Sequence, residues 1–201
     1  MIGIINYGCN NLQAIQNNLE SLNMKYDIID ENTKNVNYDK YILPGVSAFD
    51  SSITNLKKLK IFDEILDEII NKKKLLLGIC AGMHLLGKSS EEGSEQGLDL
   101  IPEKVVKIKE KNKLPVPHMG WNTINIKKDN PLTKDISNGS YFYFCHSYKY
   151  SKIDDSYNIA TTDYEDVFCS IINKENIFGV QFHPEKSHDN GQKIFLNFKK
   201  M

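Results

Sequence analysis

The first half of the chain alternates short apolar runs with apolar residues at helical spacing, and this alternation restricts the folds open to it. Four runs predict buried strands, at Ile2–Ile5, Tyr26–Ile29, 41–43 and 75–77. Helical spacing predicts helices near 12–22, 61–70 and 81–86. Asn10 or Asn11 can cap the first of these helices. Because strands that alternate with helices pair in parallel, we expect a parallel sheet covered on both faces.

The second half of the chain predicts mainly strands. Turn residues separate six short strand-like runs, at 105–108, 123–126, 141–144, 159–161, 168–172 and 177–181. A last helix carries Ile194, Phe195 and Phe198 on one face. We therefore expect antiparallel strands added to the parallel sheet. No repeat or linker divides the sequence, so residues 1–201 should form a single domain, with 89–97 as a solvated connecting loop.

The charge composition argues against a polyanionic partner. The chain has 25 lysines, no arginine and a net charge of −1, whereas bidentate recognition of phosphates and base edges relies mainly on arginine. This weakens a nucleic-acid function without excluding it, because lysines and helix N-termini also bind phosphate. No apolar stretch approaches the ~18 residues that span a membrane. We expect no membrane or targeting segment.

The cysteines favour free thiols over disulfides or a metal site. Cys9, Cys80, Cys145 and Cys169 form no CxxC pair, and no histidine lies at metal-ligand spacing from any of them. We therefore expect a protein of the reducing cytoplasm that holds no metal.

Cys80 lies where a buried strand meets a helix, within Gly78-Ile79-Cys80-Ala81-Gly82. The flanking glycines permit a sharp turn that lifts the thiol out of the sheet, as in the nucleophile elbow of hydrolases. The helix N-terminus favours a thiolate, and the amide of Ala81 can stabilise an oxyanion. A second amide can come from the loop that contains Gly45 and Val46. A buried cysteine after an apolar run is more commonly a core residue, so catalysis requires a partner base.

His183 and Glu185 provide that base and its orienting carboxylate. In an extended segment, residues two positions apart project to one side, so that Glu185 can hold the imidazole while His183 faces Cys80. A free thiol is a poor nucleophile at neutral pH, because its pKa is about 8.5, and pairing with histidine raises the thiolate fraction. His-Pro-Glu alone is also typical of a surface turn. Together with Cys80 it predicts a catalytic triad.

These motifs carry a resemblance to a known family. The segments around Cys80 and at 181–185 resemble the triad-type, class I glutamine amidotransferases. Three further segments, at 117–122, 141–148 and 160–164, resemble the glutaminase subunits of imidazole glycerol phosphate synthase, and the likeness covers essentially the full chain. The resemblance implies a flavodoxin-like three-layer α/β/α fold with a mostly parallel sheet. It also implies glutamine hydrolysis through a cysteinyl thioester, no cofactor, and ammonia channelled to a (β/α)8 cyclase subunit in a heterodimer.

Site residues carried over from the resemblance fall into three groups. Cys80, His183 and Glu185 would be catalytic. The oxyanion and the bound glutamine would contact Gly45, Val46, Ala81, His84, His146, Ser147 and Tyr148. The cyclase would contact His118, Met119, Trp121, Asn122 and Lys186, with Trp121 near the mouth of the ammonia tunnel. The alternative for Trp121 is a core aromatic residue.

Four positions depart from the family pattern. Family members usually have leucine at Ala81, glutamine at His84 and glycine at Ser47 and Asn10, which predicts altered binding or gating with the chemistry retained. Two alternative functions stay open. The chain can be a paralogous glutaminase that supplies ammonia to a surface-sugar amidotransferase, or a non-catalytic assembly subunit.

Overall fold

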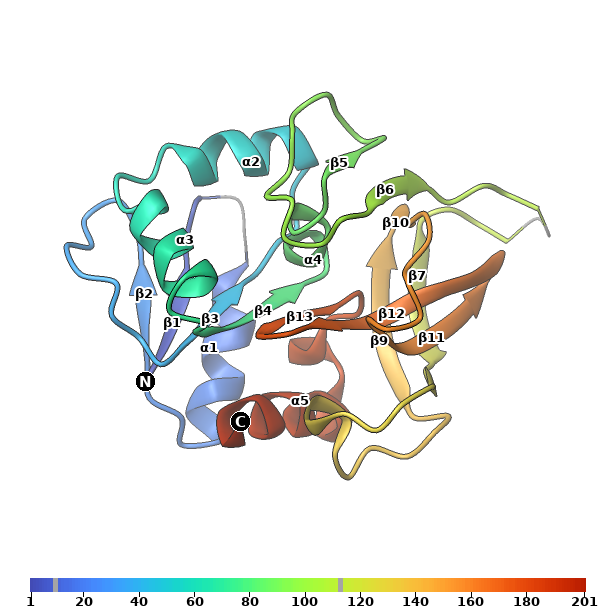
Figure 1. The fold of residues 1–201 in the computed structure, drawn as a ribbon. Coiled ribbons are helices and arrows are strands. Elements are labelled where there is room, and N and C mark those ends of the chain that lie inside the picture. The colour runs from blue at the N-terminus through green and yellow to red at the C-terminus, as the bar shows by residue number, and fades with distance from the viewer. Residues whose placement is uncertain (9–10, 112–113) are drawn as a thin grey trace.

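A central sheet of eight strands organises the molecule (Figure 1). The computed structural model describes residues 1–8, 11–111 and 114–201. In spatial order the strands are β2 (Tyr26–Ile29), β1 (Ile2–Ile5), β3 (Lys40–Leu43), β4 (Leu75–Ile79), β13 (Ile177–Val180), β12 (Asp166–Lys174), β11 (Asn158–Tyr164) and β8 (Asn125–Ile126). The first five of these run parallel, and the last three join in antiparallel pairs. The predicted parallel sheet with antiparallel additions is thereby confirmed.

Helices cover the sheet on both faces (Figure 1). The helices are α1 (Leu12–Ser21), α2 (Phe49–Lys57), α3 (Phe62–Ile70), α4 (Ala81–Leu85) and α5 (His188–Lys200). One core contains the buried residues Ile15 and Phe195, from α1 and α5. A second core contains Ile53 and Ile65, from α2 and α3. Since each face of the sheet has its own core, the predicted three-layer α/β/α architecture is confirmed.

Two smaller sheets lie beside the main one. The first orders β10 (Tyr148–Tyr150), β6 (Lys104–Lys107) and β5 (Ser89–Ser90), and the second pairs β7 (His118–Thr123) with β9 (Tyr141–His146). Two short 3₁₀ helices, η1 (Pro131–Thr133) and η2 (Pro184–Lys186), complete the elements. No helix within the described ranges is long and apolar enough to cross a membrane.

The structure corrects the sequence-based elements in three places. Helix α2 was not predicted, although its buried Phe49, Ile53 and Leu56 recur at helical spacing. Segment 89–97 is not a simple solvated loop: it contains β5, and the carboxylate of Asp50 accepts hydrogen bonds from the amides of Ser94 and Glu95 at 2.9 Å each. Asn11 occupies the N-cap position of α1 without a side-chain bond, and Asn10 lies outside the described residues.

Candidate active site

Cys80 sits on a sharp turn between β4 and α4. Its backbone has φ 52° and ψ −112°, a conformation that residues other than glycine rarely adopt. The Cys80 amide donates to the Val180 carbonyl at 2.8 Å, which ties the turn to the end of β13. The side chain is buried, and Sγ lies 3.6 Å from the carbonyl oxygen of Cys145. The sequence therefore builds the strand–turn–helix geometry of a nucleophile elbow.

Two glycines allow the start of α4 to approach the loop after β3. A Cβ atom on Gly82 would lie 1.9 Å from the Leu43 carbonyl oxygen, and one on Gly45 would lie 2.4 Å from the Gly82 amide nitrogen. Any side chain at either position would force the two segments apart. This contact brings the loop with Val46 next to Cys80, and Val46 and Ala81 line the same cavity.

His183 and Glu185 meet as a buried pair. His183 Nδ1 lies 2.7 Å from Glu185 Oε1, and both side chains are at least 95% buried. Segment Pro184–Lys186 is a 3₁₀ helix rather than the extended run expected, because Pro184 with its fixed φ starts the turn. The turn still returns the Glu185 carboxylate to the imidazole.

The surroundings of His183 favour its charged form. Burial alone would lower the pKa of the imidazole, but the charge and hydrogen bond of Cys80, together with the hydrogen bond and charge of Glu185, raise it to about 10. A protonated His183 beside Cys80 can stabilise the thiolate form that a cysteine nucleophile uses.

These residues open into a cavity of about 400 Å³. Most of the residues predicted for the oxyanion and for glutamine line it together with Cys80 and His183, namely Val46, Ala81, His84, His146, Ser147 and Tyr148. Gly45 lies behind the lining, in contact with Gly82. Lys186, predicted to face the cyclase, is exposed and lines the rim of this cavity.

Glu92 also lines the cavity and was missed by sequence reasoning. Its Oε2 accepts a hydrogen bond from the Phe49 amide at 3.1 Å, and partial burial raises the pKa of the carboxyl. The signal for Glu92 lay in the acidic 89–97 segment, which the sequence favoured as a solvated connection. Residues 91–96 are exposed, as a solvated connection should be, but the pairing of β5 with β6 anchors the segment so that Glu92 also lines the cavity.

His84 is buried at the base of the cavity. Its Nε2 lies 2.7 Å from Gln181 Oε1, and burial lowers the pKa of the ring to about 4. Since an amide oxygen can only accept, the neutral ring donates through Nε2. His84 therefore links α4 to the end of β13, and its Nε2 is occupied by the protein.

The predicted partner-facing residues divide between two sides of β7. Met119 is 61% and Trp121 47% exposed, so Trp121 is not a core aromatic residue. His118 is 3% exposed, which corrects its placement on the partner surface. The side chain of Asn122 also turns inwards and donates to His118 Nε2. The reason is strand alternation, which sends neighbouring residues to opposite faces.

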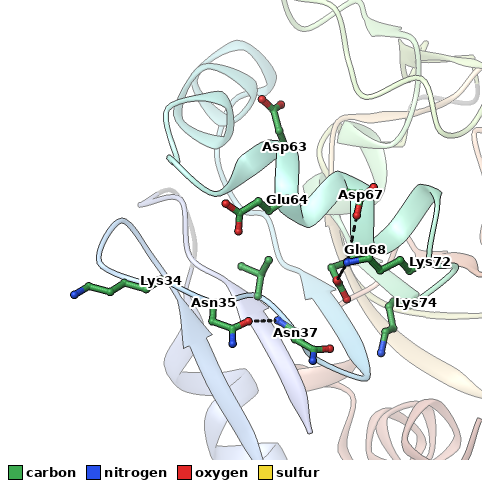
Figure 2. A pocket seen from close by; sticks show the side chains of 10 residues that line it. Lys34, Asn35, Asn37, Asp63, Glu64, Asp67, Glu68, Lys72 and Lys74 are labelled. Carbon is green, nitrogen blue, oxygen red and sulfur yellow. Dashed lines mark hydrogen bonds and ion pairs between the residues drawn. The ribbon is translucent and has the colours of Figure 1, made fainter.

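A second cavity, of about 730 Å³, lies near α3 and the segment before β3 (Figure 2). Ten residues line it, all lysines, acidic residues, asparagines and one valine: Lys34, Asn35, Val36, Asn37, Asp63, Glu64, Asp67, Glu68, Lys72 and Lys74. The buried Glu68 pairs with Lys72 at 2.5 Å (Figure 2). This cavity has no cysteine or histidine in its lining. Across the described part of the chain, no group of three or more His, Cys, Asp or Glu residues could hold a metal ion.

Comparison with known proteins gives the class. The family model for "Glutamine amidotransferase class-I" matches residues 3–201. The solved structure of PurLQS from Thermotoga maritima superposes with a TM-score of 0.77 at 20% identity, covering 99% of this chain and 97% of that one, which supports the fold. With this fold and a cysteine–histidine–glutamate site, the chain belongs to the class I glutamine amidotransferases.

Closer relatives narrow the class to one family. The chain is 46% identical to imidazole glycerol phosphate synthase subunit HisH 2 of Methanococcus maripaludis, covering 100% of this chain and 99% of the relative. It is 43% identical to subunit HisH of Leptospira borgpetersenii, covering 98% of each chain. The chain is thus a member of the HisH family of imidazole glycerol phosphate synthase subunits, and the family resemblance inferred from the sequence is confirmed.

Proposed function

We propose that the chain hydrolyses glutamine at Cys80 as the glutaminase subunit of imidazole glycerol phosphate synthase, and passes the ammonia to a (β/α)8 cyclase partner. The single observation that carries the proposal is the buried Cys80–His183–Glu185 constellation, which opens into a cavity of about 400 Å³. The HisH relatives match the chain over its full length and favour histidine biosynthesis over the surface-sugar alternative. The intact triad argues against a non-catalytic assembly subunit.

The chemistry follows from the charge state of the pair. The Cys80 thiolate attacks the side-chain amide carbon of glutamine and forms a tetrahedral oxyanion. Amides near Val46 and Ala81 stabilise that oxyanion. His183, held in place by Glu185, gives its proton to the departing nitrogen, and ammonia leaves behind a thioester. His183 then takes a proton from water, whose oxygen attacks the thioester to release glutamate and restore the thiolate.

The ends of the cavity match the amino-acid end of glutamine. Glu92 supplies a carboxylate for the α-ammonium group, since a charge-assisted hydrogen bond is stronger than a neutral one. Ser147 and Tyr148 supply polar groups in the same lining, next to His146, whose two ring nitrogens are bonded within the protein. His84 lies at the base with Nε2 committed to Gln181, so it shapes the cavity instead of replacing a substrate-binding glutamine atom for atom.

The exposed face of β7 and β9 provides a surface for the cyclase. Met119 and Trp121 project from it, and Trp121 stacks on His188 with ring centroids 5.1 Å apart. The Lys186 ammonium lies 5.5 Å from the centre of the Tyr143 ring, beside the cavity rim. A partner seated here would cover the mouth of the cavity and receive ammonia without loss to water.

The test compares two cysteines in the purified complex. Cys80→Ala should abolish glutamate and ammonia release, because it removes the nucleophile. Cys169→Ala is the matched control, since burial raises the pKa of that thiol and it lies outside the cavity. A diazoketone analogue of glutamine should label Cys80 alone. Persistent glutamine hydrolysis by Cys80→Ala would contradict the proposal.

A further inference from the structure

A row of hydrogen bonds runs from β7 to the wall of the active-site cavity. Asn122 Nδ2 donates to His118 Nε2 at 3.2 Å. His118 Nδ1 lies 3.0 Å from His146 Nε2, and His146 Nδ1 lies 2.8 Å from the Tyr148 carbonyl oxygen. The row thus starts on the strand that carries the exposed Trp121 and ends at a residue that lines the cavity.

The donor at one end and the acceptor at the other fix the direction of every hydrogen bond in the row. The Tyr148 carbonyl can only accept, so His146 carries its proton on Nδ1 and accepts through Nε2. His118 must then donate through Nδ1 and accept through Nε2. At the other end, Asn122 Oδ1 accepts from the Thr123 amide at 2.7 Å, while Nδ2 also reaches the Asp163 carbonyl at 3.1 Å. Each ring therefore has a single usable tautomer.

Packing fixes the His118 ring as firmly as the hydrogen bonds do. The ring stacks on Tyr164 with centroids 3.8 Å apart and an interplanar angle of 18°. Its other stacking partner is Phe144, at 4.8 Å and 19°. Burial lowers the pKa of His118 to about 4 and that of His146 well below its usual value, so both rings stay neutral. Both nitrogens of His118 are occupied, and its ring is held against two aromatic neighbours.

The row of hydrogen bonds bears on catalysis because it ends at the wall of the cavity that contains Cys80. Segment 145–148 forms a wall of the cavity, and the Cys145 carbonyl is 3.6 Å from Cys80 Sγ. We propose that His118 is a positioning residue: its Nδ1 hydrogen bond to Nε2 fixes the orientation of the His146 ring, and thereby holds this wall in the geometry that binds glutamine. The proposal rests on the proposed function of the cavity.

The first test measures the ring nitrogens of His146 and needs no substrate. In the full chain, ¹⁵N resonances of His146 should show a protonated Nδ1 and a bare Nε2. His118→Phe keeps an aromatic ring against Phe144 and Tyr164 but removes both nitrogens, so the Nε2 resonance of His146 should shift as that nitrogen loses its hydrogen-bond donor, while Nδ1 stays protonated. His118→Asn keeps a donor at the Nδ1 position and should preserve the native Nε2 resonance. An unchanged His146 spectrum in His118→Phe would overturn the proposal.

The second test measures glutamine hydrolysis by the complex with its partner. We expect His118→Phe to raise KM for glutamine about tenfold with a smaller change in kcat, and His118→Asn to recover most of the loss. Ile136→Val, which trims a buried side chain of the same core, is the control for stability and should leave KM unchanged. Asn122→Ala removes only the first donor and should raise KM less, which keeps the test available if His118→Phe does not fold.

Equal losses in His118→Phe and His118→Asn that follow their melting temperatures would overturn the positioning role. Absence of hydrolysis in the wild-type complex would contradict the proposed function, while the ¹⁵N result would stand by itself.

Discussion

At the scale of single residues, the active site depends on a few charges placed where water is scarce. His183 is almost wholly buried, and its proton is retained because Cys80 and Glu185 outweigh the cost of burial. Glu92 has less support, since one backbone amide and the cavity are its main surroundings. This difference supports the proposed roles, in which His183 and Glu185 take part in the chemistry and Glu92 recognises a cationic group.

Replacing Glu92 by glutamine should weaken glutamine binding without stopping the reaction. The change removes the negative charge but keeps an oxygen for the Phe49 amide, so the fold should hold. Loss of a charge-assisted hydrogen bond costs about 1.5–3 kcal/mol, which corresponds to a rise in KM of roughly 10- to 150-fold. Steady-state glutaminase assays of the complex measure this rise in KM. Glu91→Gln, at the exposed neighbouring position, is the control; an equal effect of the two variants would refute the role of Glu92.

At the scale of elements, the nucleophile elbow exists because β3 and the start of α4 touch. The sequence predicted β4, α4 and the sharp turn, since Gly78, Cys80 and Gly82 mark them directly. It could not predict how close Gly82 comes to Leu43, because that distance depends on the packing of two separate βα units. Local pattern therefore indicated the turn, and tertiary contact explains its glycines.

Replacing Gly82 by alanine should damage this element specifically. The new Cβ would lie 1.9 Å from the Leu43 carbonyl oxygen, so the loop with Val46 or the start of α4 must move. Overpacking of this kind costs typically about 1–3 kcal/mol, and the displaced amides should lower kcat at least about tenfold. Thermal unfolding and glutaminase assays measure the two effects. Gly139→Ala, at a glycine with open space around it, is a matched control for glycine replacement, although its positive φ adds some strain. Full activity in Gly82→Ala would show that the contact is dispensable.

Tertiary pairing also explains another miss at this scale. β7 was not predicted because its segment has few β-branched residues, and its strand geometry comes from pairing with β9 over His118–Thr123. The family resemblance of segment 117–122 put His118 and Asn122 on the partner surface, whereas strand alternation turns them inwards. Helix α2 is different, because its buried residues recur at helical spacing in the sequence and it was still missed. The rest of the first half was predictable because its strands and helices alternate in sequence.

At the scale of the whole molecule, three histidines are buried in their neutral form. Burial lowers the pKa of His84 and His118 to about 4, and it lowers that of His146 well below its usual value. In the unfolded chain each would titrate near 6.5. Between these values the unfolded state binds more protons, so stability is present above pH 6.5 and is lost as pH falls towards 4.

The expected outcome is a protein that unfolds readily in mild acid. With up to three extra protons taken up on unfolding, the free energy of unfolding should fall by up to about 4 kcal/mol per pH unit below pH 6. Chemical denaturation between pH 7 and 4.5 measures the slope. His84→Gln should reduce this slope by the contribution of about one proton, since that site no longer titrates. A flat profile over this range would mean that the buried histidines accept protons without penalty.

The β7–β9 face is the surface proposed for the partner, and we propose that Trp121 is its central anchor. The ring is 47% exposed yet already ordered, because it stacks on His188 and meets Tyr143 edge-on at 6.0 Å. A side chain ordered before binding loses little entropy on association. Exposed tryptophans at such surfaces commonly contribute 2 kcal/mol or more to binding.

Trp121→Ala should therefore weaken the complex at least about 30-fold and leave the isolated chain folded. A partner on this face covers the cavity and is thereby coupled to glutamine hydrolysis. Activity of the variant should therefore fall because less complex forms, and it should return when excess partner is added. Titration calorimetry and a glutaminase assay over a range of partner concentrations measure both effects. Val167→Ala is the control, because Val167 is 62% exposed but lies on β12, outside this face. Unchanged affinity in Trp121→Ala would place the partner on another surface of the molecule. Ammonia would then have to leave the Cys80 cavity by a route other than the rim at Lys186.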